Sequence, residues 1–450
     1  MRSKTFHIVS LGCAKNTVDT HSMTELLQQA GYTPVEKPNS AAILIVNTCG
    51  FIQPARQESI QVLNELAQRK KANQVLIAAG CMVELHHQML RNAIPGIDSF
   101  ISTRRWMDIP KVVEDTLAKA SPQRTQRHSA RAIDPLVEDS VLRAAQQGAS
   151  AYLKIADGCR RACAFCSIPL IKGNAVSRPP EAILKDAEAL QKMGVCEINL
   201  IAQDTTDYGH DLGIKNGLIY LLERLVERVP DIPWIRVLYT YPSPAIEHLV
   251  ACMVQHPQIL KYLDIPLQHA HPGVLRRMNR PHNVDWVHKT LQKMRGSLPE
   301  LTLRTTFIVG YPGETQKEFQ TLLDFVSDIR FDHLGAFVYS FEPGTPGAAL
   351  GDPIPPEIKQ QRLEILMELQ KKISLQNNRR LVGKTLDVLI EGSGDGLAVG
   401  RTYRDAPEID GLVFINQEMS IGKLYPIQIT GAMPHDLIGK YSKSANAPVR

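Results

Sequence analysis

The residues with the clearest chemical potential in this sequence are three cysteines close together, Cys159, Cys163 and Cys166, which we call the close set. Their C-x3-C-x2-C spacing follows a predicted strand and lets three thiolates converge on one soft metal centre. Three thiolates bind three irons of a 4Fe–4S cluster and leave the fourth iron open to a substrate or cofactor. Catalytic zinc sites likewise keep one coordination position free of protein ligands. A structural zinc site or reactive surface thiols are the alternatives, but no second pair is spaced to complete a zinc finger.

A second set, Cys13, Cys49 and Cys81, is spread along the chain at separations of 36 and 32 residues, and we call it the dispersed set. Each cysteine follows a predicted strand and has a glycine beside it. Because the carboxyl ends of parallel strands meet at one edge of an open sheet, we expect the three thiols to meet there. The alternative is three unrelated cysteines buried in a core. Cys196 and Cys252 are interpreted as packing residues without a chemical role.

The elements that position the dispersed set alternate between strands and helices. The predicted strands are Phe6–Leu11, Ala41–Val46 and Val75–Ala79, with helices at Thr20–Gln29 and Ala55–Arg69. This order predicts an α/β domain over residues 3–120, with right-handed βαβ units and a parallel sheet. The polar, arginine-containing stretch that follows, residues 121–150, is interpreted as a linker with a short helix, and the linker itself is assigned to residues 121–148.

The rest of the chain predicts two further domains. Residues 149–378 contain six strands separated by helical stretches, which predicts an open partial (β/α)6 barrel. These strands are Tyr152–Ile155, Glu197–Ala202, Ile235–Tyr239, Tyr262–Ile265, Leu303–Val309 and Leu334–Tyr339. The amphipathic segment Pro356–Arg380 follows them. Residues 379–446 contain short strands between Gly- and Asp-rich turns, which predicts a small β-barrel. These are Lys384–Ile390, Gly396–Arg401, Gly411–Ile415 and Leu424–Thr430.

Composition narrows the class of protein. The chain has 450 residues, of which 44% are apolar and 22% charged, so a wholly disordered chain is excluded. No apolar run is long enough to predict a membrane-spanning helix. Eight cysteines without a convincing export signal favour the reducing cytoplasm, where cysteine clusters bind metals more often than they form disulfides.

The close set lies in a region that resembles the radical S-adenosylmethionine superfamily. The resemblance rests on the spacing, on Phe165 before the third cysteine, and on the βα repeats that follow. It implies that the open iron binds the amino and carboxylate groups of S-adenosylmethionine. Reductive cleavage of that cofactor then yields a deoxyadenosyl radical.

Four residues are candidates for cofactor binding. The segment Thr306–Glu314 resembles the strand end that packs against adenine in this superfamily, which implicates Ile308 and Gly310. Thr306 departs from the glycine often found there, and a plain strand end with its turn is the alternative. Gln203 and Asp204 follow a predicted strand and are expected at the mouth of the barrel with the cofactor.

Two three-cysteine sets followed by a small β-barrel resemble the methylthiotransferase family over essentially the entire chain. Ser10–Asn16 and Asn47–Ile52 match that family's N-terminal domain, and the tail resembles its TRAM domain. The resemblance implies two 4Fe–4S clusters. The cluster on Cys159, Cys163 and Cys166 would cleave S-adenosylmethionine. The auxiliary cluster, on Cys13, Cys49 and Cys81, would hold the sulfur to be transferred. No catalytic residue is assigned outside the clusters.

Within that family, some members modify an adenosine in transfer RNA, whereas RimO-type members modify an aspartate in small-subunit ribosomal protein twelve. The transfer-RNA members usually have asparagines around the positions of Asp204 and Thr206. The segment Gly400–Gly411 resembles the RimO pattern.

The distribution of charge agrees with a protein substrate. Residues 383–450 carry 7 basic and 8 acidic side chains, whereas residues 1–150 carry 17 and 13. A barrel that binds RNA should carry more basic than acidic side chains, because contacts with phosphates dominate the affinity for RNA. Asp405, Glu408 and Asp410 are therefore interpreted as a turn that recognises a basic protein, and direct RNA binding is not expected. A solvated turn is the alternative.

The sequence thus predicts an enzyme that replaces a C–H bond on an aspartate β-carbon with C–S–CH3. No ionisable side chain removes that hydrogen at neutral pH, so a radical cofactor is needed. Transfer-RNA methylthiolation is the alternative with the same chemistry, and a zinc-stabilised RNA-binding module is the alternative from another class. The expected partners are a small-subunit ribosomal protein as substrate and an electron donor such as flavodoxin or ferredoxin, in the cytoplasm and without a membrane.

Overall fold

The computed structural model describes residues 4–118 and 140–441, and the chain divides into two compact units. Unit 1 comprises Met1–Ala145, Tyr152–Val176 and Glu342–Thr345. Unit 2 comprises Gln146–Ala151, Ser177–Phe341 and Pro346–Arg450. No helix within the described residues is long and apolar enough to cross a membrane.

Unit 1 is built on a five-stranded parallel sheet in the order β2-β1-β3-β4-β5. Its strands are β1 Thr5–Ser10, β2 Thr33–Pro34, β3 Ile43–Thr48, β4 Val75–Gly80 and β5 Ser99–Ser102. Every residue of β3 and β4 is buried, as expected for central strands of a sheet covered on both faces. The predicted N-terminal parallel sheet is confirmed.

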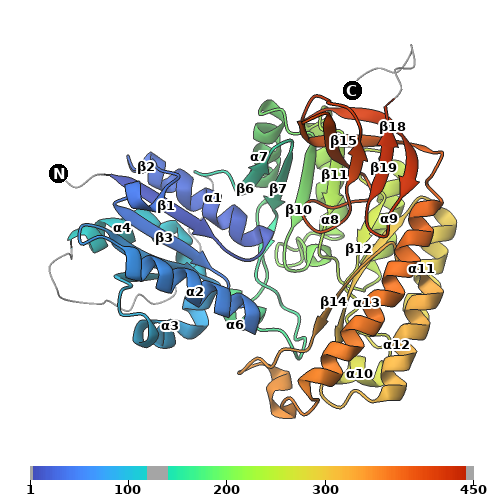
Figure 1. Ribbon diagram of the computed structural model, residues 1–450, viewed down its shortest axis with the longest axis horizontal. Coiled ribbons are helices and arrows are strands. Elements are labelled where there is room, and N and C mark those ends of the chain that lie inside the picture. Colours follow the sequence, from blue (N-terminus) through green and yellow to red (C-terminus); the bar gives the residue numbers. More distant parts are fainter. Residues whose placement is uncertain (1–3, 119–139, 442–450) are drawn as a thin grey trace. The chain divides into compact units, whose positions relative to one another are not determined.

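Four helices flank this sheet (Figure 1). They are α1 Ala14–Gln29, α2 Gln53–Arg69, α3 Cys81–Ala93 and α4 Ile109–Ala118. Alternate residues of β3 point to opposite faces. Ile43 and Ile45 pack into a core with α1 and α4, whereas Leu44 and Val46 pack into a second core with α2 and α3. This alternation fixes the sheet between two helical layers and so fixes the positions of its strand ends.

Unit 1 also contains the segment that carries the close set. This segment includes the last residues of β7 Ser150–Lys154, the short strand β8 Ala156–Asp157, and α6 Ile168–Lys172. Between β8 and α6 the chain forms the loop with Cys159, Cys163 and Cys166. Both cysteine sets therefore belong to the same compact unit.

The six strands predicted for the partial barrel are present and keep their chain order in space. They are β7 and, in unit 2, β10 Glu197–Ile201, β11 Trp234–Val237, β12 Tyr262–Asp264, β13 Thr302–Val309 and β14 His333–Val338. β10 pairs in parallel with β11, β12 with β13, and β13 with β14. A parallel bridge between Ile235 and Ile259 joins β11 to the residues that precede β12. This arrangement matches the predicted open partial barrel.

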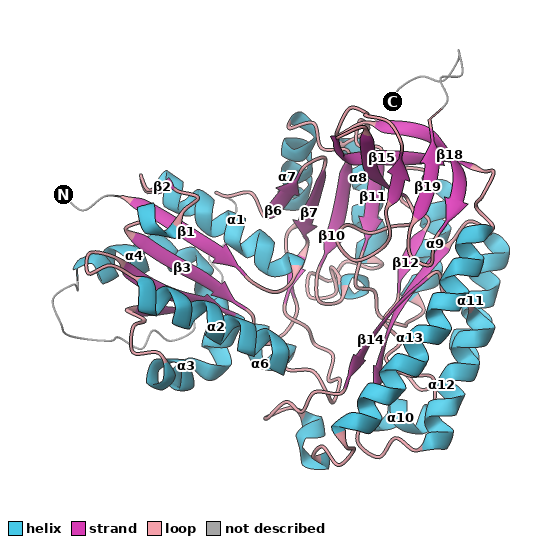
Figure 2. Cartoon of the chain, viewed as in Figure 1, coloured by secondary structure: helices cyan, strands magenta, loops and turns pink. Residues whose placement is uncertain are grey.

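Helices separate these strands along the chain (Figures 1 and 2). They are α7 Pro180–Lys192, α8 Gly217–Arg228, α9 Ala245–Gln255, α10 Pro272–Arg277, α11 Val284–Ser297 and α12 Gln316–Ile329. The predicted amphipathic segment is α13 Pro356–Arg379, which packs against α12 and β14. The strand β6 Ala144–Gln147 was not predicted, because it falls in the polar stretch interpreted as a linker. Residues 140–150 contain no helix, so the short helix predicted in that stretch is not found there. The rest of the stretch, up to residue 139, lies outside the described residues.

The C-terminal part of unit 2 is a closed barrel in the order β15-β16-β17-β19-β18. Figure 2 shows its strands β15, β18 and β19 close together. Its strands are β15 Thr385–Gly394, β16 Leu397–Thr402, β17 Val413–Ile415, β18 Leu424–Ala432 and β19 Leu437–Lys440. Buried side chains such as Val388, Val413 and Ile427 fill its interior. The sequence predicted the first four strands but missed β19, which is short and contains Gly439.

Candidate metal centre

The dispersed set lies at the carboxyl edge of the parallel sheet of unit 1. Cys13 follows β1 and caps the start of α1, Cys49 directly follows β3, and Cys81 directly follows β4 and begins α3. β1, β3 and β4 are neighbours in the sheet. Each cysteine is therefore placed by the end of a strand, as predicted.

Close contacts between the loops bring these cysteines together. Gly12 has a φ of 92°, and a Cβ atom on it would lie 2.7 Å from Cys49 Cβ and 2.9 Å from Cys49 Sγ. A Cβ atom on Gly50 would lie 2.7 Å from the Cα atom of Met82. The loop of Cys13 thus touches Cys49, and the loop of Cys49 touches the backbone beside Cys81. Only glycine permits this approach at both positions.

Asn16 ties the three strand ends to one another, and sequence reasoning missed it. Its Nδ2 donates to the carbonyl of Leu11 at 2.8 Å and to that of Thr48 at 3.1 Å. Its Oδ1 accepts from Cys81 Sγ at 3.6 Å. The sequence offered one signal, an asparagine three residues after Cys13. The structure shows that this asparagine is buried.

Burial favours the protonated form of two of the dispersed thiols, Cys49 and Cys81, whereas Cys13 is exposed. Burial raises the pKa of Cys49, and it raises the pKa of Cys81 to about 12, opposed by the nearby ammonium of Lys172. Cys13 raises the pKa of both other thiols further, since thiolates repel one another. Buried thiols such as Cys49 and Cys81 become anionic when a metal centre or a cation offsets their charge.

No disulfide bond joins any two of the eight cysteines. Among the residues that the structure describes, no three Cys, His, Asp or Glu side chains are close enough together to hold one metal ion. An iron–sulfur cluster of several irons makes a different demand, because each thiolate binds a separate iron. The three adjacent strand-end thiols fit the soft donor set of such a cluster.

The close set lies on a loop with its own backbone supports. Cys159 N–H donates to the carbonyl of Gly173 at 3.0 Å, and Cys166 N–H donates to that of Cys163 at 3.1 Å. Gly158 has a φ of 75°, and a Cβ atom on it would overlap the carbonyl of Asn174. Cys163 is buried, whereas the other two thiols are partly exposed. The loop therefore packs against the turn that follows α6.

The loops of the two sets are linked within unit 1. Ser167, the residue after the last cysteine of the close set, donates its hydroxyl to the carbonyl of Phe51 at 3.4 Å. Phe51 lies two residues after Cys49. The bond joins the close set to the second loop of the dispersed set.

The four candidate cofactor residues lie in unit 2 at the carboxyl ends of two of its strands. Gln203 and Asp204 follow β10, and buried Asp204 accepts a 2.5 Å hydrogen bond from Thr206. Ile308 belongs to β13, and Gly310 follows it with a φ of 72°. The N–H of Gly310 donates to Glu314, and a Cβ atom on Gly310 would overlap the side chain of Lys359. Their role in binding S-adenosylmethionine stays a prediction.

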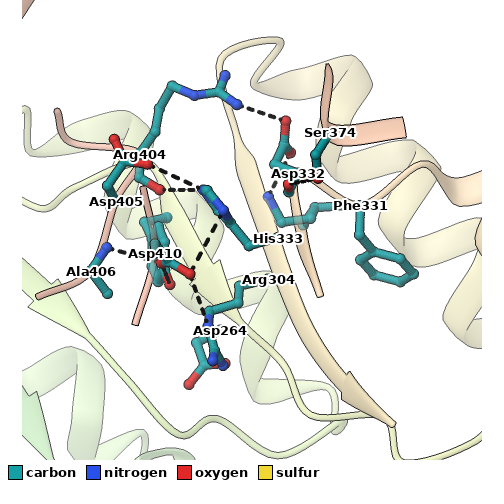
Figure 3. A network of polar contacts seen from close by, with 12 residues as sticks. Asp264, Arg304, Phe331, Asp332, His333, Ser374, Arg404, Asp405, Ala406 and Asp410 are labelled. Atoms are coloured by element: carbon teal, nitrogen blue, oxygen red, sulfur yellow. Dashed lines mark hydrogen bonds and ion pairs between the residues drawn. The ribbon is translucent and has the colours of Figure 1, made fainter. Parts of the chain in front are cut away.

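Two of the three predicted recognition acids, Asp405 and Asp410, point towards His333 and Arg304 instead of towards solvent (Figure 3). Asp410 lies 3.3 Å from Arg304 and 3.7 Å from His333, and Asp405 lies 3.6 Å from His333. Burial raises the pKa of Asp405, whereas His333 and Arg304 overcome burial and lower the pKa of Asp410. The expectation of a solvent-facing acidic turn thus holds for Glu408 alone, which is exposed.

A second buried ion network joins the barrel to the strands of unit 2. Arg401 of β16 pairs with Glu197 of β10 at 2.5 Å, and Arg236 of β11 pairs with the same carboxylate at 2.9 Å. Burial raises the pKa of Glu197, but the two guanidinium groups outweigh it and hold the pKa at about 2. The acidic turn and these arginines therefore hold the barrel against the β-strands.

Both remaining cysteines were expected to be buried packing residues, but Cys196 is only partly buried. Cys252 is buried in α9, as predicted. Cys196 precedes β10 and its Sγ lies 3.2 Å from the carbonyl of Gly422. Neither lies among the residues of the two cysteine sets described above.

Comparison with family models divides the chain into three matched regions. The uncharacterized protein family UPF0004 matches residues 5–102, the radical SAM superfamily matches residues 153–326, and the TRAM domain matches residues 382–441. The first match contains the dispersed set, the second contains the close set, and the third covers the barrel.

Among solved structures, the chain is similar to the radical S-adenosylmethionine methyltransferase TsrM from Kitasatospora setae, which was determined with cobalamin and a [4Fe-4S] cluster bound. The TM-score is 0.55 at 13% identity, over 88% of this chain and 80% of that one. At this identity the likeness shows the fold alone.

Three curated relatives are similar over nearly their full length, and each is named ribosomal protein uS12 methylthiotransferase RimO. The relative from Roseiflexus sp. (strain RS-1) is 45% identical over 97% of this chain and 96% of its own length. The relative from Chloroflexus aurantiacus is 44% identical over 97% and 99%, and that from Thermoanaerobacter sp. is 43% identical over 97% and 100%. The chain therefore belongs to the RimO family of radical S-adenosylmethionine methylthiotransferases, enzymes that use S-adenosylmethionine and two 4Fe–4S clusters.

Proposed function

We propose that this enzyme methylthiolates the β-carbon of an aspartate in ribosomal protein uS12. The observation that carries the proposal is the near full-length similarity to relatives that bear this name, at 43 to 45% identity. The presence of two three-cysteine sets in one compact unit supports the same chemistry. The reaction would take place in the cytoplasm, with a flavodoxin or ferredoxin as electron donor.

In this proposal the close set, Cys159, Cys163 and Cys166, holds the cluster that binds and cleaves S-adenosylmethionine. With three thiolate ligands, that cluster supplies an open iron and, on reduction, a radical able to abstract hydrogen from carbon. The residues of the chain hold the loop in place: the turn after α6 supports Cys159, and Gly158 allows the close packing. Gln203, Asp204, Ile308 and Gly310 are proposed to contact the rest of the cofactor.

The dispersed set, Cys13, Cys49 and Cys81, is proposed to hold the auxiliary cluster and the sulfur to be transferred. Asn16 would keep the three ligand loops in register, since it bonds to all three strand ends. Burial of Cys49 and Cys81 would limit the access of water to the sulfur. The protein's main contribution is then positioning.

The barrel is proposed to meet a protein rather than RNA. Residues 383–450 carry 7 basic and 8 acidic side chains, which suits a basic partner better than a phosphate backbone. Since Asp405 and Asp410 have partners within unit 2, the recognition role is proposed for Glu408.

Deletion of the gene tests the proposed function. We expect ribosomal protein uS12 from the deletion strain to lack the mass of a methylthio group on one aspartate, while transfer RNA is unchanged. Complementation with the wild-type gene should restore the mass, and complementation with a Cys159→Ala variant should not. Loss of a methylthiolated adenosine from transfer RNA, with uS12 unchanged, would contradict the proposal.

A further inference from the structure

Within the described residues, one edge of strand β14 has no neighbouring strand. The strand lies at the end of the sheet β12-β13-β14 and pairs in parallel with β13 alone. An unpaired edge presents backbone N–H and C=O groups that can bond to another polypeptide, so proteins usually shorten or cover such edges. Whether this edge can bind a partner therefore depends on which part of it is covered.

Side chains of α13 bond to the backbone just before and just after β14. This helix packs against the strand (Figure 1). Gln370 Nε2 donates to the carbonyl of Phe331 at 2.8 Å, and Lys359 Nζ donates to the carbonyl of Tyr339 at 3.4 Å. The two ends of the strand are therefore fixed within unit 2.

The last residues of β14 leave their outer edge bare. Tyr339 N–H donates to the carbonyl of Val309 in β13 at 2.9 Å. Because alternate residues of a parallel strand direct their backbone groups to opposite edges, Phe337 also bonds to β13, whereas Ala336 and Val338 face outwards. In the part of the chain that the structure describes, no hydrogen bond engages these outward groups. Two N–H and two C=O groups are thus available to a further strand.

The same residues expose apolar side chains. Phe337 is 55% exposed and Val338 is 37% exposed. Phe337 pairs with Ile308 of β13, so the two side chains project to the same face of the sheet. Ile308 is one of the residues proposed to contact S-adenosylmethionine, and Gly310 follows at the end of the same strand. The bare edge therefore borders the proposed cofactor site.

The chemistry of this edge fits a polypeptide partner. Its outward groups are main-chain donors and acceptors with the spacing of an extended chain, and a nucleic acid has no row of amides to pair with them. The atom to be modified in the proposed reaction is the β-carbon of an aspartate, which is one bond away from the main chain. Pairing with the main chain of the substrate therefore fixes the position of that carbon closely.

We propose that the segment of uS12 that carries the target aspartate binds as an additional strand along the outer edge of β14. Its main chain bonds to the outward N–H and C=O groups of Ala336 and Val338, and the aspartate projects to the face that Phe337 shares with Ile308. Phe337 supports a substrate side chain on the same face. The inference rests on the proposed function and adds to it how the substrate is held.

Hydrogen exchange in the wild-type enzyme tests the pairing directly. The full-length, anaerobically reconstituted enzyme with S-adenosylmethionine is compared with and without uS12, and mass spectrometry with peptide fragmentation resolves single amides. We expect the amides of Ala336 and Val338 to exchange roughly tenfold more slowly, or slower still, when uS12 is bound. The amide of Phe337 already bonds to β13 and is the internal control, which should change little.

The possible outcomes of this measurement separate the inference from the proposed function. Methylthiolation of uS12 without slower exchange at Ala336 and Val338 would overturn the inference alone. An enzyme that does not methylthiolate uS12 would overturn the proposed function, and the inference with it. Slower exchange of the same two amides with transfer RNA in place of uS12 would contradict the selection of a polypeptide.

The variant Val338→Pro tests the pairing independently. Proline lacks the outward N–H and its ring occupies the edge, but an edge strand tolerates it at a position whose N–H has no partner in the sheet. We expect the KM for uS12 to rise roughly tenfold with a smaller change in kcat, because the lost bonds hold the substrate before and during the reaction. Urea unfolding should give a stability close to that of wild type.

Ser99→Pro is the matched control on another sheet. Ser99 lies in β5, the edge strand of unit 1, and Asp98 N–H bonds to the carbonyl of Leu76, so the amide of Ser99 also faces outwards. This variant should leave the KM for uS12 unchanged. A folded Val338→Pro enzyme with the wild-type KM would overturn the inference. If Val338→Pro does not fold, hydrogen exchange in the wild-type enzyme decides the question by itself.

Discussion

At the scale of single residues, the geometry of the dispersed set depends on one amide. Asn16 is fully buried and bonds to the ends of β1 and β3 and to the first residue of α3. The sequence alone predicts that the cysteines form two sets, because residue type and position after a predicted strand are local properties. Asn16 is not, since its partners Leu11, Thr48 and Cys81 come together only in the folded sheet.

Replacing Asn16 with alanine should weaken both the fold of unit 1 and the retention of the auxiliary cluster. The change removes two hydrogen bonds that the Asn16 amide donates to carbonyls, one buried and one partly buried, a loss of about 1–3 kcal/mol in the free energy of unfolding. Urea unfolding of the metal-free protein and iron analysis after reconstitution measure the two effects. Asn73→Ala, at an exposed position, is the matched control. An Asn16→Ala protein with the stability and iron content of the control would refute this role.

The two cysteine sets should be separable by substitution. Replacing Cys159, Cys163 and Cys166 with alanine should abolish reductive cleavage of S-adenosylmethionine, because the open iron is lost. Replacing the dispersed set should leave that cleavage measurable and stop methylthiolation. Chromatographic detection of 5′-deoxyadenosine and mass spectrometry of the substrate provide the two readouts. Methylthiolation at the wild-type rate without the dispersed set would rule out the auxiliary-cluster assignment.

At the scale of elements, close contacts between the loops at the carboxyl edge of the sheet hold the three cysteines of the dispersed set near one another. Gly12 combines a left-handed backbone with contact to Cys49, so two independent constraints act at one position. The alternation of apolar strands and helices makes this sheet predictable from sequence. The contacts between its loops are not, because they depend on the exact positions of the strand ends.

We expect Gly12→Ala to be more destabilising than the backbone strain alone explains. A left-handed alanine costs roughly 1–2 kcal/mol, and the added methyl group would also displace the Cys49 side chain. Gly148→Ala is the matched control, since Gly148 has a φ of 59° and no atom near its missing side chain. Urea unfolding should show the larger loss for Gly12→Ala, together with lower iron retention. Equal losses would mean that the contact with Cys49 does not matter.

The ion network around Glu197 should make the stability of unit 2 depend on pH. The folded protein holds the pKa of this carboxyl at about 2, below its ordinary value of 4.5. Its ionised form therefore stabilises the fold above about pH 4.5, and that stabilisation is lost as the pH falls towards 2. We predict a drop of a few kcal/mol over this range in wild type, measured by urea midpoints.

A Glu197→Gln variant should show a shallower fall in stability over the same pH range, because the titrating group is gone. The variant should be less stable than wild type at neutral pH, since Arg236 and Arg401 lose their shared carboxylate. Identical pH profiles in the two proteins would show that Glu197 does not govern the acid response.

At the scale of the whole molecule, family membership excludes the zinc-stabilised RNA-binding module and makes the chain an enzyme. Within unit 2, Asp405 and Asp410 join the β-barrel to the strands (Figure 3). Arg401 makes a further link through Glu197. From sequence, the two acids were interpreted as a surface turn. Their partners Arg304 and His333 lie about 70 to 110 residues earlier in the chain, so local charge patterns cannot reveal that the acids are buried.

Charge reversal at the barrel should therefore be tested at the exposed acid. We expect Glu408→Lys to lower the rate on a basic protein substrate, most clearly at low ionic strength, because exposed charges steer encounter and are screened by salt. Asp395→Lys makes the same change in net charge at another exposed position of the barrel and should have a smaller effect. Equal effects would assign the steering to net charge instead of to the turn. Cleavage of S-adenosylmethionine without substrate should be unchanged in both variants.

The central claim is that this enzyme transfers a methylthio group to an aspartate of ribosomal protein uS12. The most direct measurement incubates the anaerobically reconstituted enzyme with S-adenosylmethionine, a reductant and an equimolar mixture of uS12 and transfer RNA. Mass spectrometry of both products then identifies the substrate. The account predicts a methylthio group on one aspartate of uS12 and none on the RNA, and modification of the RNA with uS12 unchanged would contradict it.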